Sequence, residues 1–450
     1  MKNGSAYSMP PLREVASDSE LPAQADVVVI GGGIIGVSAA YHLARKGHSV
    51  VLLEKGRVAA EQSGRNWGWC RKQNRDEREL PLAKHSMDLW ESLAGEIGAD
   101  MGFRRTGLIY VTKDKDQLAE WEKWARMARE YQVHSRILTP DEAKALTPGN
   151  EQDWIGGVHS PTDGRAEPSM AAPALAEAAR KLGVKLFQGC AVRGLETSGG
   201  RVSGVVTERG RVGANAVLCA AGAWSSMLCR RHGIDLPQAG VRSTIFYTTP
   251  AAEVTPGGLV TPDFTISRRL DGGYIVAAND RGRLEVTPQG LRYARQFWPM
   301  FKARRKSLKF GVSRSLLDGP EAIVGKWPFD RPSPFERHRI YGPLPDTSII
   351  KPALDRVIGA YPALQGMQMA HAWGGWIDSM PDGIPVISGL DRLPGFYLAT
   401  GFSGHGFGIG PGAGRLAADL VAGDAPVVDP TPFRYARLVD GTALGKPGMM

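Results

Sequence analysis

Hydrophobic positions near the N-terminal end form two short continuous runs with a helical pattern between them. Residues 27–30 are four consecutive β-branched residues, and residues 50–53 form a second apolar run. Between the runs, residues 38–46 carry apolar side chains at helical spacing and end at Gly47. Continuous apolar runs of this length are typical of strands that are buried on both faces. The pattern therefore predicts a strand, a helix and a second strand in succession.

Glycines fill the turn between the first strand and the helix. Gly31, Gly33 and Gly36 follow the strand directly, and Glu54 closes the second strand. Glycines at this spacing permit a sharp turn, a close approach of the backbone to a pyrophosphate and tight packing of the helix on the sheet. The phosphates would lie at the helix N-terminus, and the Glu54 carboxylate would accept the hydroxyls of an adenosine ribose. We interpret the unit as a dinucleotide site rather than a structural glycine turn or a membrane span over residues 27–44.

Two later segments combine a buried strand with small residues. Residues 215–225 indicate a strand that ends in small side chains, which lets the backbone pass close to a cofactor. Residues 395–400 predict another strand, followed by a glycine-rich loop over 401–411 and an amphipathic helix over 413–421. The N–H groups of a helix N-terminus stabilise the negative charge that a reduced flavin carries around N1 and O2. These segments favour a flavin over a nicotinamide cofactor, with the late loop at the pyrimidine end of the ring.

Length and composition fit a large enzyme. The 450 residues can bury an extensive core in two or more lobes, and 42% of them are hydrophobic. Residues 1–24 lack the continuous apolar segment of a secretory signal, and we interpret them as a flexible leader. The cysteines show neither metal-ligand nor Cys-x-x-Cys spacing, which predicts no metal site and a reduced, cytoplasmic setting. They are Cys70, Cys190, Cys219 and Cys229.

The formal charge of +9 is unevenly distributed. Basic residues lie beside acidic ones along most of the chain, so no nucleic-acid partner is expected. Residues 291–310, in contrast, contain no acid and interleave aromatic with cationic side chains. This stretch is either a solvated helix face or a surface that docks on a redox partner or on anionic lipid at the inner face of a membrane.

Five motifs occur in order between residues 26 and 437. They are the opening glycine motif with Glu54, then residues 63–68, 220–225, 381–387 and 401–407. Together they resemble the D-amino acid oxidase and sarcosine oxidase family of FAD enzymes. The resemblance implies an α/β fold, in which a discontinuous, Rossmann-like FAD-binding domain joins a substrate domain built on a mixed or antiparallel β-sheet. It assigns residues 25–100, 157–239 and 366–440 to the FAD-binding domain, and residues 101–156 and 240–365 to the substrate domain.

The pattern within the substrate domain agrees with this assignment. Residues 105–112 predict a strand, and residues 116–131 predict a helix. Residues 240–278 predict several strands separated by turns, the last of them after an Asp-Gly-Gly turn. We expect these strands to form the sheet that covers the substrate face of the flavin.

The resemblance implies oxidation of a carbon bonded to nitrogen. A hydride passes to flavin N5 and water hydrolyses the resulting imine, so the outcome is oxidative deamination or dealkylation. A secondary amine or an N-substituted or D-amino acid is favoured as substrate. The electrons pass to O2 or to a quinone or protein acceptor, and residues 274–278 lack the lysine that sarcosine-type oxidases place over the flavin. A flavin subunit of a hetero-oligomer and an RNA-modifying flavoprotein are the alternatives.

The resemblance also assigns catalytic and pocket residues. Arg71 follows the 63–68 loop, where family members place an arginine beside the flavin ring, and a surface arginine is the alternative. His405 would hydrogen-bond the ring or only its own loop. Trp69 and Trp373 would form walls of the pocket, although tryptophan is more often a core residue.

The usual carboxylate-binding side chains of the family are absent. Gly408 stands where sarcosine-type members carry a lysine, and Asp378 lies near the place where some amino-acid oxidases carry an arginine. Either other arginines hold a substrate carboxylate, or a larger, cationic amine meets Asp378, with Tyr274 nearby. No cysteine occurs at residues 371–376, so FAD is expected to be bound without a covalent link. The candidate arginines are Arg71, Arg268, Arg269 and Arg314.

The expected FAD contacts come from the glycine motif, the end of the second strand, the 63–68 loop, the 220–225 segment and the C-terminal loop. A strand pair over residues 183–187 and 190–192 would also bring Val192 to the adenine, unless this valine is an ordinary core residue. The full set is Gly31, Gly33, Ile34, Ile35, Gly36, Glu54, Lys55, Ser63, Gly64, Arg65, Asn66, Trp67, Gly68, Val192, Ala220, Ala221, Gly222, Trp224, Gly374, Phe402, Ser403, Gly404, His405, Gly406 and Phe407.

Overall fold

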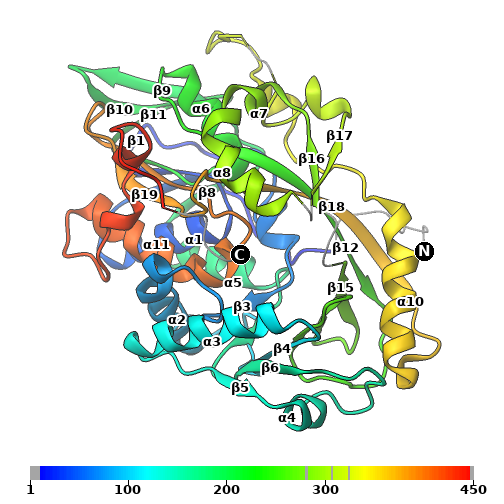
Figure 1. Cartoon of the computed structure of the whole chain (residues 1–450). Coiled ribbons are helices and arrows are strands. Elements are labelled where there is room, and N and C mark those ends of the chain that lie inside the picture. Colours follow the sequence, from blue (N-terminus) through cyan, green and yellow to red (C-terminus); the bar gives the residue numbers. More distant parts are fainter. Residues whose placement is uncertain (1–10, 279–281, 306–307, 323–324, 446–450) are drawn as a thin grey trace, which may run out of the picture.

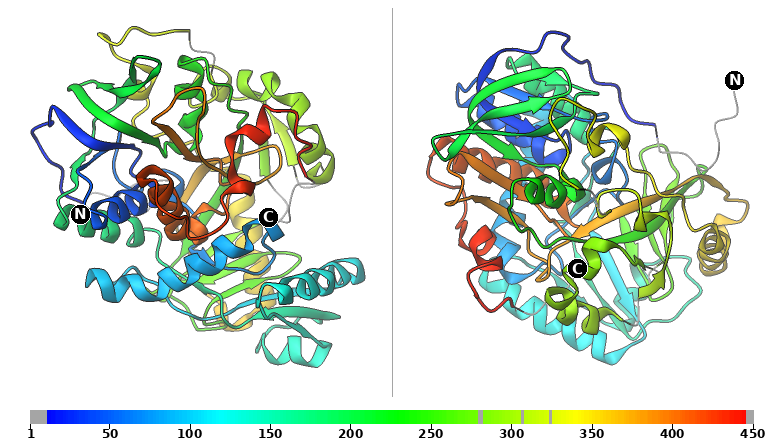
Figure 2. Two further views of the ribbon diagram at one scale, coloured as in Figure 1. Left: turned by 90° about the vertical axis from the view of Figure 1, so that its left-hand side faces the viewer. Right: turned by 90° about the horizontal axis from the view of Figure 1, so that it is seen from above.

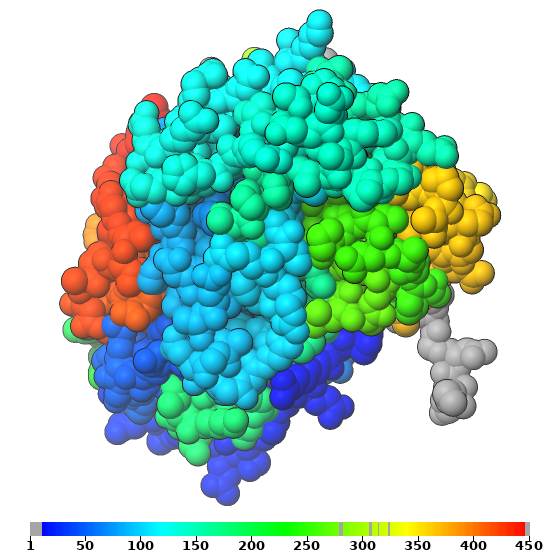
Figure 3. Space-filling view, turned by 90° about the horizontal axis from the view of Figure 1, so that it is seen from below, coloured from blue at the N-terminus to red at the C-terminus, as the bar shows by residue number. Residues whose placement is uncertain are grey.

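Two large sheets organise the chain into two lobes (Figure 1). The computed structural model describes residues 11–278, 282–305, 308–322 and 325–445. In Figure 2 the blue, green and orange strands of the first sheet gather in one lobe, and the cyan segment around residues 115–145 lies in the other. Seen from below, that cyan segment forms one continuous mass that adjoins the green residues near 250–275 and the yellow residues near 355 (Figure 3).

The first sheet has the strand order β19-β20-β11-β1-β2-β8. Strand β1 lies at its centre and pairs in parallel with β2 and β11, as in a doubly wound fold. An antiparallel pair, β9 and β10, extends from β11. The bounds are β1 Gln24–Ile30, β2 Val50–Leu53, β8 Lys185–Phe187, β9 Val192–Ser198, β10 Arg201–Thr207, β11 Gly210–Cys219, β19 Val386–Gly389 and β20 Phe396–Thr400.

Strand β1 is buried on both faces, which confirms the expectation from its continuous apolar run. Val27 and Val29 join the hydrophobic cluster beneath helices α1, α2, α5 and α11. Val28 and Ile30 join a second cluster on the opposite face, together with α6. The helices are α1 Ile34–Arg45, α2 Leu80–Ile97, α5 Ala171–Lys181, α6 Ser225–Arg231 and α11 Gly406–Ala422.

Two local predictions in this lobe are wrong. Strand β8 pairs with β2 and β9 pairs with β10, so the segments around 183–187 and 190–192 do not form a pair with each other. Helix α11 begins at Gly406, ahead of the predicted start at residue 413, and it is buried along most of its length rather than amphipathic. Its small residues allow close packing, because a Cβ on Gly414 would lie 2.4 Å from Cβ of Ser38 in α1.

The second sheet has the order β17-β16-β12-β15-β14-β13-β4-β6-β5, with β18 also paired to β12. It is mixed, because β13–β4 and β16–β17 are parallel and the remaining pairs are antiparallel. This confirms the expected type of sheet. The bounds are β4 Leu108–Thr112, β5 Arg136–Leu138, β6 Gly156–Ser160, β12 Ala239–Thr248, β13 Gly258–Val260, β14 Thr265–Arg268, β15 Tyr274–Ala277, β16 Gly282–Glu285, β17 Leu308–Gly311 and β18 Met369–Ser379.

Side chains on the two faces of this sheet have different surroundings. Phe246 and Val276 face a core that includes helix α10, whereas Ile245 and Ile275 face the first lobe beside Trp67. The remaining elements are the two-stranded sheet of β3 Trp69–Cys70 and β7 Gly164–Arg165 and the helices α3 Lys115–Glu130, α4 Pro140–Ala145, α7 Pro288–Arg292, α8 Ala294–Arg304, α9 Pro334–Arg337 and α10 Ile350–Ala360.

The structure corrects two domain boundaries and the leader. Strand β6 ends at Ser160 and β18 at Ser379, and both belong to the second sheet, so the boundaries predicted at 157 and 366 cut through its strands. The leader is not a free tail where it is described, because Arg13 donates to the carbonyl of Ser169 and Asp18 to that of Leu186. Residues 1–10 lie outside the described residues.

Candidate active site

A cavity of about 950 Å³ takes its walls from both lobes. It touches the carboxyl ends of β1 and β2, the C-terminal loop before α11, strands β12 and β16 of the second sheet, and helix α8. Ligands of open α/β sheets bind at the carboxyl ends of the strands, which is where the glycine motif lies. Its shape and position therefore fit an extended dinucleotide.

The glycine motif forms the turn that the sequence predicts. Gly31 has φ +111°, and a Cβ there would lie 2.4 Å from the carbonyl oxygen of Ala220. A Cβ on Gly36 would lie 2.0 Å from the carbonyl oxygen of Gly31, so this glycine serves packing and does not line the cavity. At the start of α1, the Ile34 amide donates to Ser63 Oγ at 2.9 Å. The first turn of the helix faces the cavity, as a phosphate site requires.

Glu54 is held rigidly where the ribose is expected. Its Oε2 accepts the Gly32 amide at 2.7 Å, and its Oε1 accepts the Gly56 amide at 2.6 Å. Burial raises the pKa of the carboxyl, whereas neighbouring Lys55 and the two amides oppose that shift. A carboxylate has about four lone-pair sites, so two remain available for ribose hydroxyls.

The 63–68 loop contributes both contacts and spacing. Ser63, Arg65, Asn66 and Trp67 line the cavity. Gly64 and Gly68 do not line it. A Cβ on either would lie within 2.4 Å of a backbone oxygen, so these glycines allow the loop to pack closely against neighbouring backbone segments. The other expected contacts that line the cavity are Gly31, Gly33, Ile34, Ile35, Glu54, Lys55, Val192, Ala220, Ala221, Gly222, Trp224, Phe402, Ser403, Gly404, His405, Gly406 and Phe407.

The C-terminal loop brings His405 to the first turn of α11. The side chain is buried, and its Nε2 lies 2.6 Å from Glu79 Oε1. Its Nδ1 has no partner among the residues that the structure describes. Burial lowers the pKa of His405, and Glu79 opposes the shift. Because the helix N-terminus also lies here, the loop offers several donors to an anionic group, as expected for the pyrimidine end of a flavin.

Two buried arginines and a tyrosine line the other end of the cavity. Arg71 packs 5.9 Å from the Trp69 ring and donates to the Gln73 carbonyl, so the surface alternative for Arg71 is wrong. Arg75 is 2% exposed, and its Nη1 lacks a partner within the described residues. Burial lowers the pKa of Arg75 to about 9. Tyr110 of β4 lies in the same wall, where burial raises its pKa and Arg71 opposes the rise.

Sequence reasoning missed Arg75 and Tyr110. Arg75 lies four residues after Arg71, and in the sequence it looks like part of a basic surface segment with Lys72 and Arg78. Tyr110 lies in a strand that was predicted correctly, but its face could not be assigned. Only the folded structure, in which β3 packs against α11 and β4 pairs with β6 and β13, places both side chains in the cavity wall.

Asp378 lines the cavity, but its carboxylate already accepts three hydrogen bonds from the protein. Gln62 Nε2 donates to Oδ1 at 2.8 Å, while Gln238 Nε2 and the Gly401 amide donate to Oδ2 at 2.9 and 3.1 Å. Burial raises the pKa of this carboxyl, and the donors oppose the shift. The residue connects β18 with the FAD-binding lobe, and this arrangement does not support its prediction as a site for a cationic amine.

Besides Gly36, Gly64 and Gly68, three further predicted contacts do not line the cavity. Tyr274 is fully buried in the core beneath α10, and its hydroxyl donates to the Ala252 carbonyl at 2.8 Å. Strand alternation explains this position, because Tyr274 and Val276 share the face opposite the cavity. Trp373 lies one layer behind the wall and donates to the Arg65 carbonyl at 3.2 Å. The third is Gly374, where a Cβ would lie 2.2 Å from the Pro343 oxygen.

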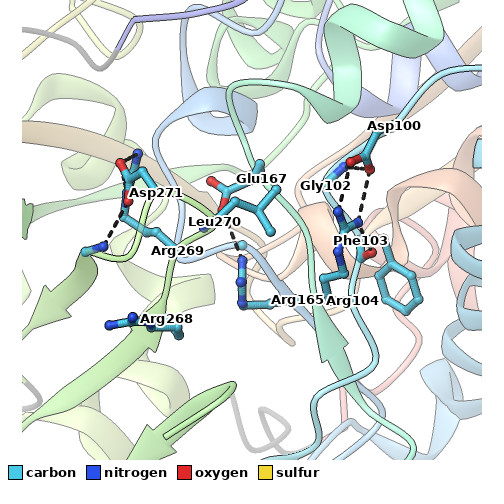
Figure 4. Close-up of polar contacts among 12 residues, drawn as sticks. Asp100, Gly102, Phe103, Arg104, Arg165, Glu167, Arg268, Arg269, Leu270 and Asp271 are labelled. Carbon is cyan, nitrogen blue, oxygen red and sulfur yellow. Dashed lines mark hydrogen bonds and ion pairs between the residues drawn. The ribbon is translucent and has the colours of Figure 1, made fainter. Parts of the chain in front are cut away.

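Arg268 and Arg269 do not line the cavity. Figure 4 shows them in a group of polar residues with Glu167 and Asp271. Arg269 pairs with Asp271 at 2.7 Å, and Glu167 accepts the Leu270 amide at 2.8 Å. The prediction that these two arginines hold a substrate carboxylate is therefore wrong. The side chain of the other candidate, Arg314, lies outside the described part of the chain.

Gly408 explains why the family's lysine cannot occur here. A Cβ at this position would lie 2.7 Å from the Trp69 carbonyl oxygen and 3.4 Å from the Arg71 nitrogen. Helix α11 thus approaches β3 too closely for any side chain. The carbonyl of Gly408 accepts hydrogen bonds from Trp90 and Ser86 of α2, which fixes that approach.

The basic stretch lies at the cavity rather than on a remote surface. Leu291, Phe297 and Trp298 contribute to the wall, although Leu291 is 66% and Trp298 53% exposed. Phe301 packs on Phe310, with ring centroids 5.4 Å apart. Part of the stretch, residues 306–307, lies outside the described residues. Helix α8 is therefore both a wall of the cavity and an exposed apolar surface.

The described residues contain no group of three His, Cys, Asp or Glu side chains arranged to hold a metal ion. The four cysteines are free and buried, and none is among the residues that line the cavity. No helix in the described ranges is long and apolar enough to cross a membrane.

Comparison with known proteins identifies the relatives of this chain. A family model described as FAD dependent oxidoreductase (DAO) matches residues 26–420. The solved structure of L-amino acid deaminase from Proteus myxofaciens in complex with anthranilate is 30% identical, with a TM-score of 0.89, over 95% of this chain and 96% of that one. Human mitochondrial sarcosine dehydrogenase is 27% identical over 91% of this chain and 41% of its own length. Glycine oxidase of Pseudomonas aeruginosa is 26% identical over 91% of this chain and 98% of its own length.

The chain spans about two-fifths of the length of the sarcosine dehydrogenases that it matches.

Proposed function

Because this chain belongs to the FAD-dependent oxidoreductase family, we propose that it oxidises the carbon–nitrogen bond of an amino acid whose carboxylate is held by Arg71 and Arg75. The observation that carries the proposal is the pair of buried guanidinium groups in the cavity wall, one with an unpartnered nitrogen. A buried charge without a partner is costly, and a carboxylate would supply both charge and acceptors. Anthranilate, which the related deaminase structure carries, is itself an amino carboxylate.

FAD, when bound, supplies the hydride acceptor. The chain would bind the substrate carboxylate and hold the C–H bond in place. Trp69, Tyr110 and Trp121 would exclude water from that end of the cavity. Two nearby cationic groups would also favour the neutral form of the substrate amine, which is the form that can release a hydride. N-substituted, D- and L-amino acids fit this scheme alike, since its contacts are to the carboxylate.

Anaerobic reduction of the bound flavin by paired compounds tests this proposal. Each amino acid in a panel of N-methyl, D- and L-amino acids is compared with its own amide, which has the same side chain but no carboxylate charge. We expect amino acids to bleach the flavin absorbance and amides to bleach it at least about a hundredfold more slowly. Equal rates for acid and amide, or reduction by simple amines alone, would contradict carboxylate recognition.

The electron acceptor forms a second part of the proposal. The exposed apolar side chains of α8 and the strand after it adjoin the cavity, and residues 291–310 contain no acid. We propose that this surface docks peripherally on anionic lipid at the inner membrane face and passes electrons to a quinone or a membrane protein. Relatives whose names include an oxidase and a dehydrogenase leave O2 as the alternative acceptor.

Vesicle co-sedimentation tests the docking surface. We expect binding to vesicles of phosphatidylglycerol but not of phosphatidylcholine, and loss of binding when Trp298→Ser and Lys302→Ser are combined. The control is Trp154→Phe, a buried change in the hydrophobic core beneath α10. Rapid reoxidation of reduced enzyme by air with release of peroxide, and no lipid binding, would instead favour an oxidase. The cytoplasmic location and the absence of a nucleic-acid partner stay predictions, as does the oligomeric state.

A further inference from the structure

Residues 333–343, here called the clasp, reach the cavity wall near Val192, where adenine is expected. The clasp begins with helix α9, whose capping box joins Ser333 and Glu336. Phe335 of α9 lines the cavity, and its ring lies 6.0 Å from that of Trp224, another wall residue. Phe335 therefore brings the chain segment between β17 and β18 to the part of the cavity wall where Val192 lies.

Lys55 uses all three of its donors, two of them on the clasp. Its Nζ donates to the carbonyls of His338 at 2.8 Å and Arg339 at 2.9 Å, and to Glu61 Oε1 at 2.7 Å. An ammonium group has three donors, so none remains for a cofactor phosphate. The same group lies 4.3 Å from the Trp224 ring. Lys55 is thus a positioning residue between the FAD-binding loop and the clasp.

Arg339 makes a matching connection from the clasp side. Its Nη1 donates to the Lys55 carbonyl at 3.0 Å, and its guanidinium forms a bidentate pair with Glu208 at 2.7 and 2.6 Å. Glu208 Oε1 also accepts the Ala191 amide at 2.6 Å, which fixes the residue beside Val192. Arg339 does not line the cavity, so it acts on a cofactor only through the clasp.

The clasp backbone fits closely against the FAD-binding loop. A Cβ on Gly56 would lie 2.4 Å from the Arg339 carbonyl oxygen. The Tyr341 amide donates to Glu61 Oε1 at 3.1 Å, and Arg65 Nη1 donates to the Tyr341 carbonyl at 2.9 Å. The loop over residues 54–65, which carries the expected ribose and pyrophosphate contacts, is therefore hydrogen-bonded to the clasp near both ends of the loop.

We propose that the clasp gates exchange of FAD at the adenine end, with Lys55 and Arg339 as the residues that keep it closed. FAD would enter and leave only when the Arg339–Glu208 pair and the Lys55 contacts open together. This would retain a cofactor that has no covalent link. A gate raises the barrier for both directions, whereas a simple wall only slows release. The proposal goes beyond the proposed function, because it concerns the cofactor and holds for any substrate.

The test measures FAD exchange in Arg339→Met and in the control Arg337→Met. Arg337 is an exposed cation at the end of α9, within the same clasp. Release is followed as the rise in free-FAD fluorescence after large dilution of the holoprotein, and uptake as quenching of FAD fluorescence by the apoprotein. We expect Arg339→Met to speed release and uptake each by at least about tenfold, with the control unchanged.

Two further measurements separate gating from loss of structure. The thermal midpoint of the Arg339→Met apoprotein should match that of wild type within about 2 °C, and Arg339→Lys should restore part of the slow exchange. Amide exchange at Tyr341 should slow when FAD binds and should slow less in Arg339→Met. Faster release with unchanged or slower uptake would show a wall without a gate, and wild-type rates in both directions would refute the clasp. Neither readout involves substrate, so both are independent of the carboxylate proposal.

Discussion

The two ends of the cavity differ in whether backbone groups or side chains form the expected contacts. At the end where FAD is expected, many of the expected contacts are backbone amides and glycines, together with the half-buried carboxylate of Glu54, and they come from elements that follow one another in the chain. At the substrate end, side chains from separate elements meet, among them Arg71, Arg75 and Tyr110. Backbone sites need a motif in a local stretch, whereas side-chain sites need the packing of distant stretches. The comparison explains why one end could be assigned residue by residue and the other could not.

The strongest test of the backbone end is Gly31→Ala. The new Cβ would lie 2.4 Å from a carbonyl oxygen, at φ +111°, so the turn must move. We expect FAD affinity to fall by more than about a hundredfold, since overpacking and a left-handed conformation each cost about 1–2 kcal/mol. Fluorescence titration of apoprotein with FAD measures it.

Gly47→Ala is the matched control for that change. Gly47 also has a positive φ, +88°, but has nothing within 4 Å of a Cβ. This variant should lose about 1 kcal/mol of folding stability and keep its FAD affinity. Equal loss of FAD in both variants would mean that backbone strain in general, and not the cradle, controls binding.

At the substrate end the largest effect is expected for Arg75→Met. Removing one partner of a buried charge pair costs about 2–5 kcal/mol, so kcat/KM for amino acids should fall by roughly a hundredfold or more. Arg78→Met, which loses a cation paired with Asp76 outside the cavity, should stay within about threefold. Steady-state kinetics with the same electron acceptor measures kcat/KM for both variants. A normal kcat/KM in Arg75→Met would remove Arg75 from the site.

The FAD-binding lobe should also carry an acid-sensitive group, His42. Burial in α1 lowers its pKa to about 3, below the ordinary 6.5, so the folded state keeps it neutral while the unfolded chain takes up a proton. Stability should therefore fall as pH drops from 6.5 towards 3, by up to about 1.4 kcal/mol per pH unit. Denaturant unfolding between pH 7 and 4 measures this pH dependence. The free energy of unfolding should change less steeply with pH in His42→Phe than in wild type, and as steeply as in wild type in the exposed variant His134→Phe. An unchanged slope in His42→Phe would contradict this assignment.

The smallest effect is expected for Asp378→Asn. The amide keeps the size but replaces one acceptor oxygen with a donor, so about 1–2 kcal/mol of stability should be lost. If Asp378 connects the lobes, cationic and neutral substrates should change together in KM. A selective rise in KM for cationic amines would restore Asp378 as a substrate site.

The sequence predicted the features that are local and repeated. Residues 27–30 alternate between two hydrophobic clusters as an all-apolar run requires, and the Gly31 turn and Glu54 lie where the motif places them. The family resemblance that the ordered motifs carry implied the fold class. These predictions depend on backbone geometry that a short stretch determines by itself.

Features that depend on register or on packing at a distance could not be predicted. Tyr274 lies in a strand that was predicted correctly, and Trp373 lies in β18, for which no strand was predicted; which face each side chain takes depends on register with neighbouring strands. Lys55 was expected at the cofactor, and only the distant carbonyls at residues 338–339 show that its donors are used elsewhere. Arg75 could be separated from a surface run only by its burial.

The central claim is that backbone holds the cofactor and side chains hold the substrate carboxylate. Two titrations on the same Arg75→Met protein test it most directly: FAD into the apoprotein, and anthranilate into the holoprotein, followed by the flavin spectrum. We predict an unchanged FAD affinity and an anthranilate affinity weaker by about a hundredfold. Loss of FAD affinity, or undiminished anthranilate binding, would contradict the account.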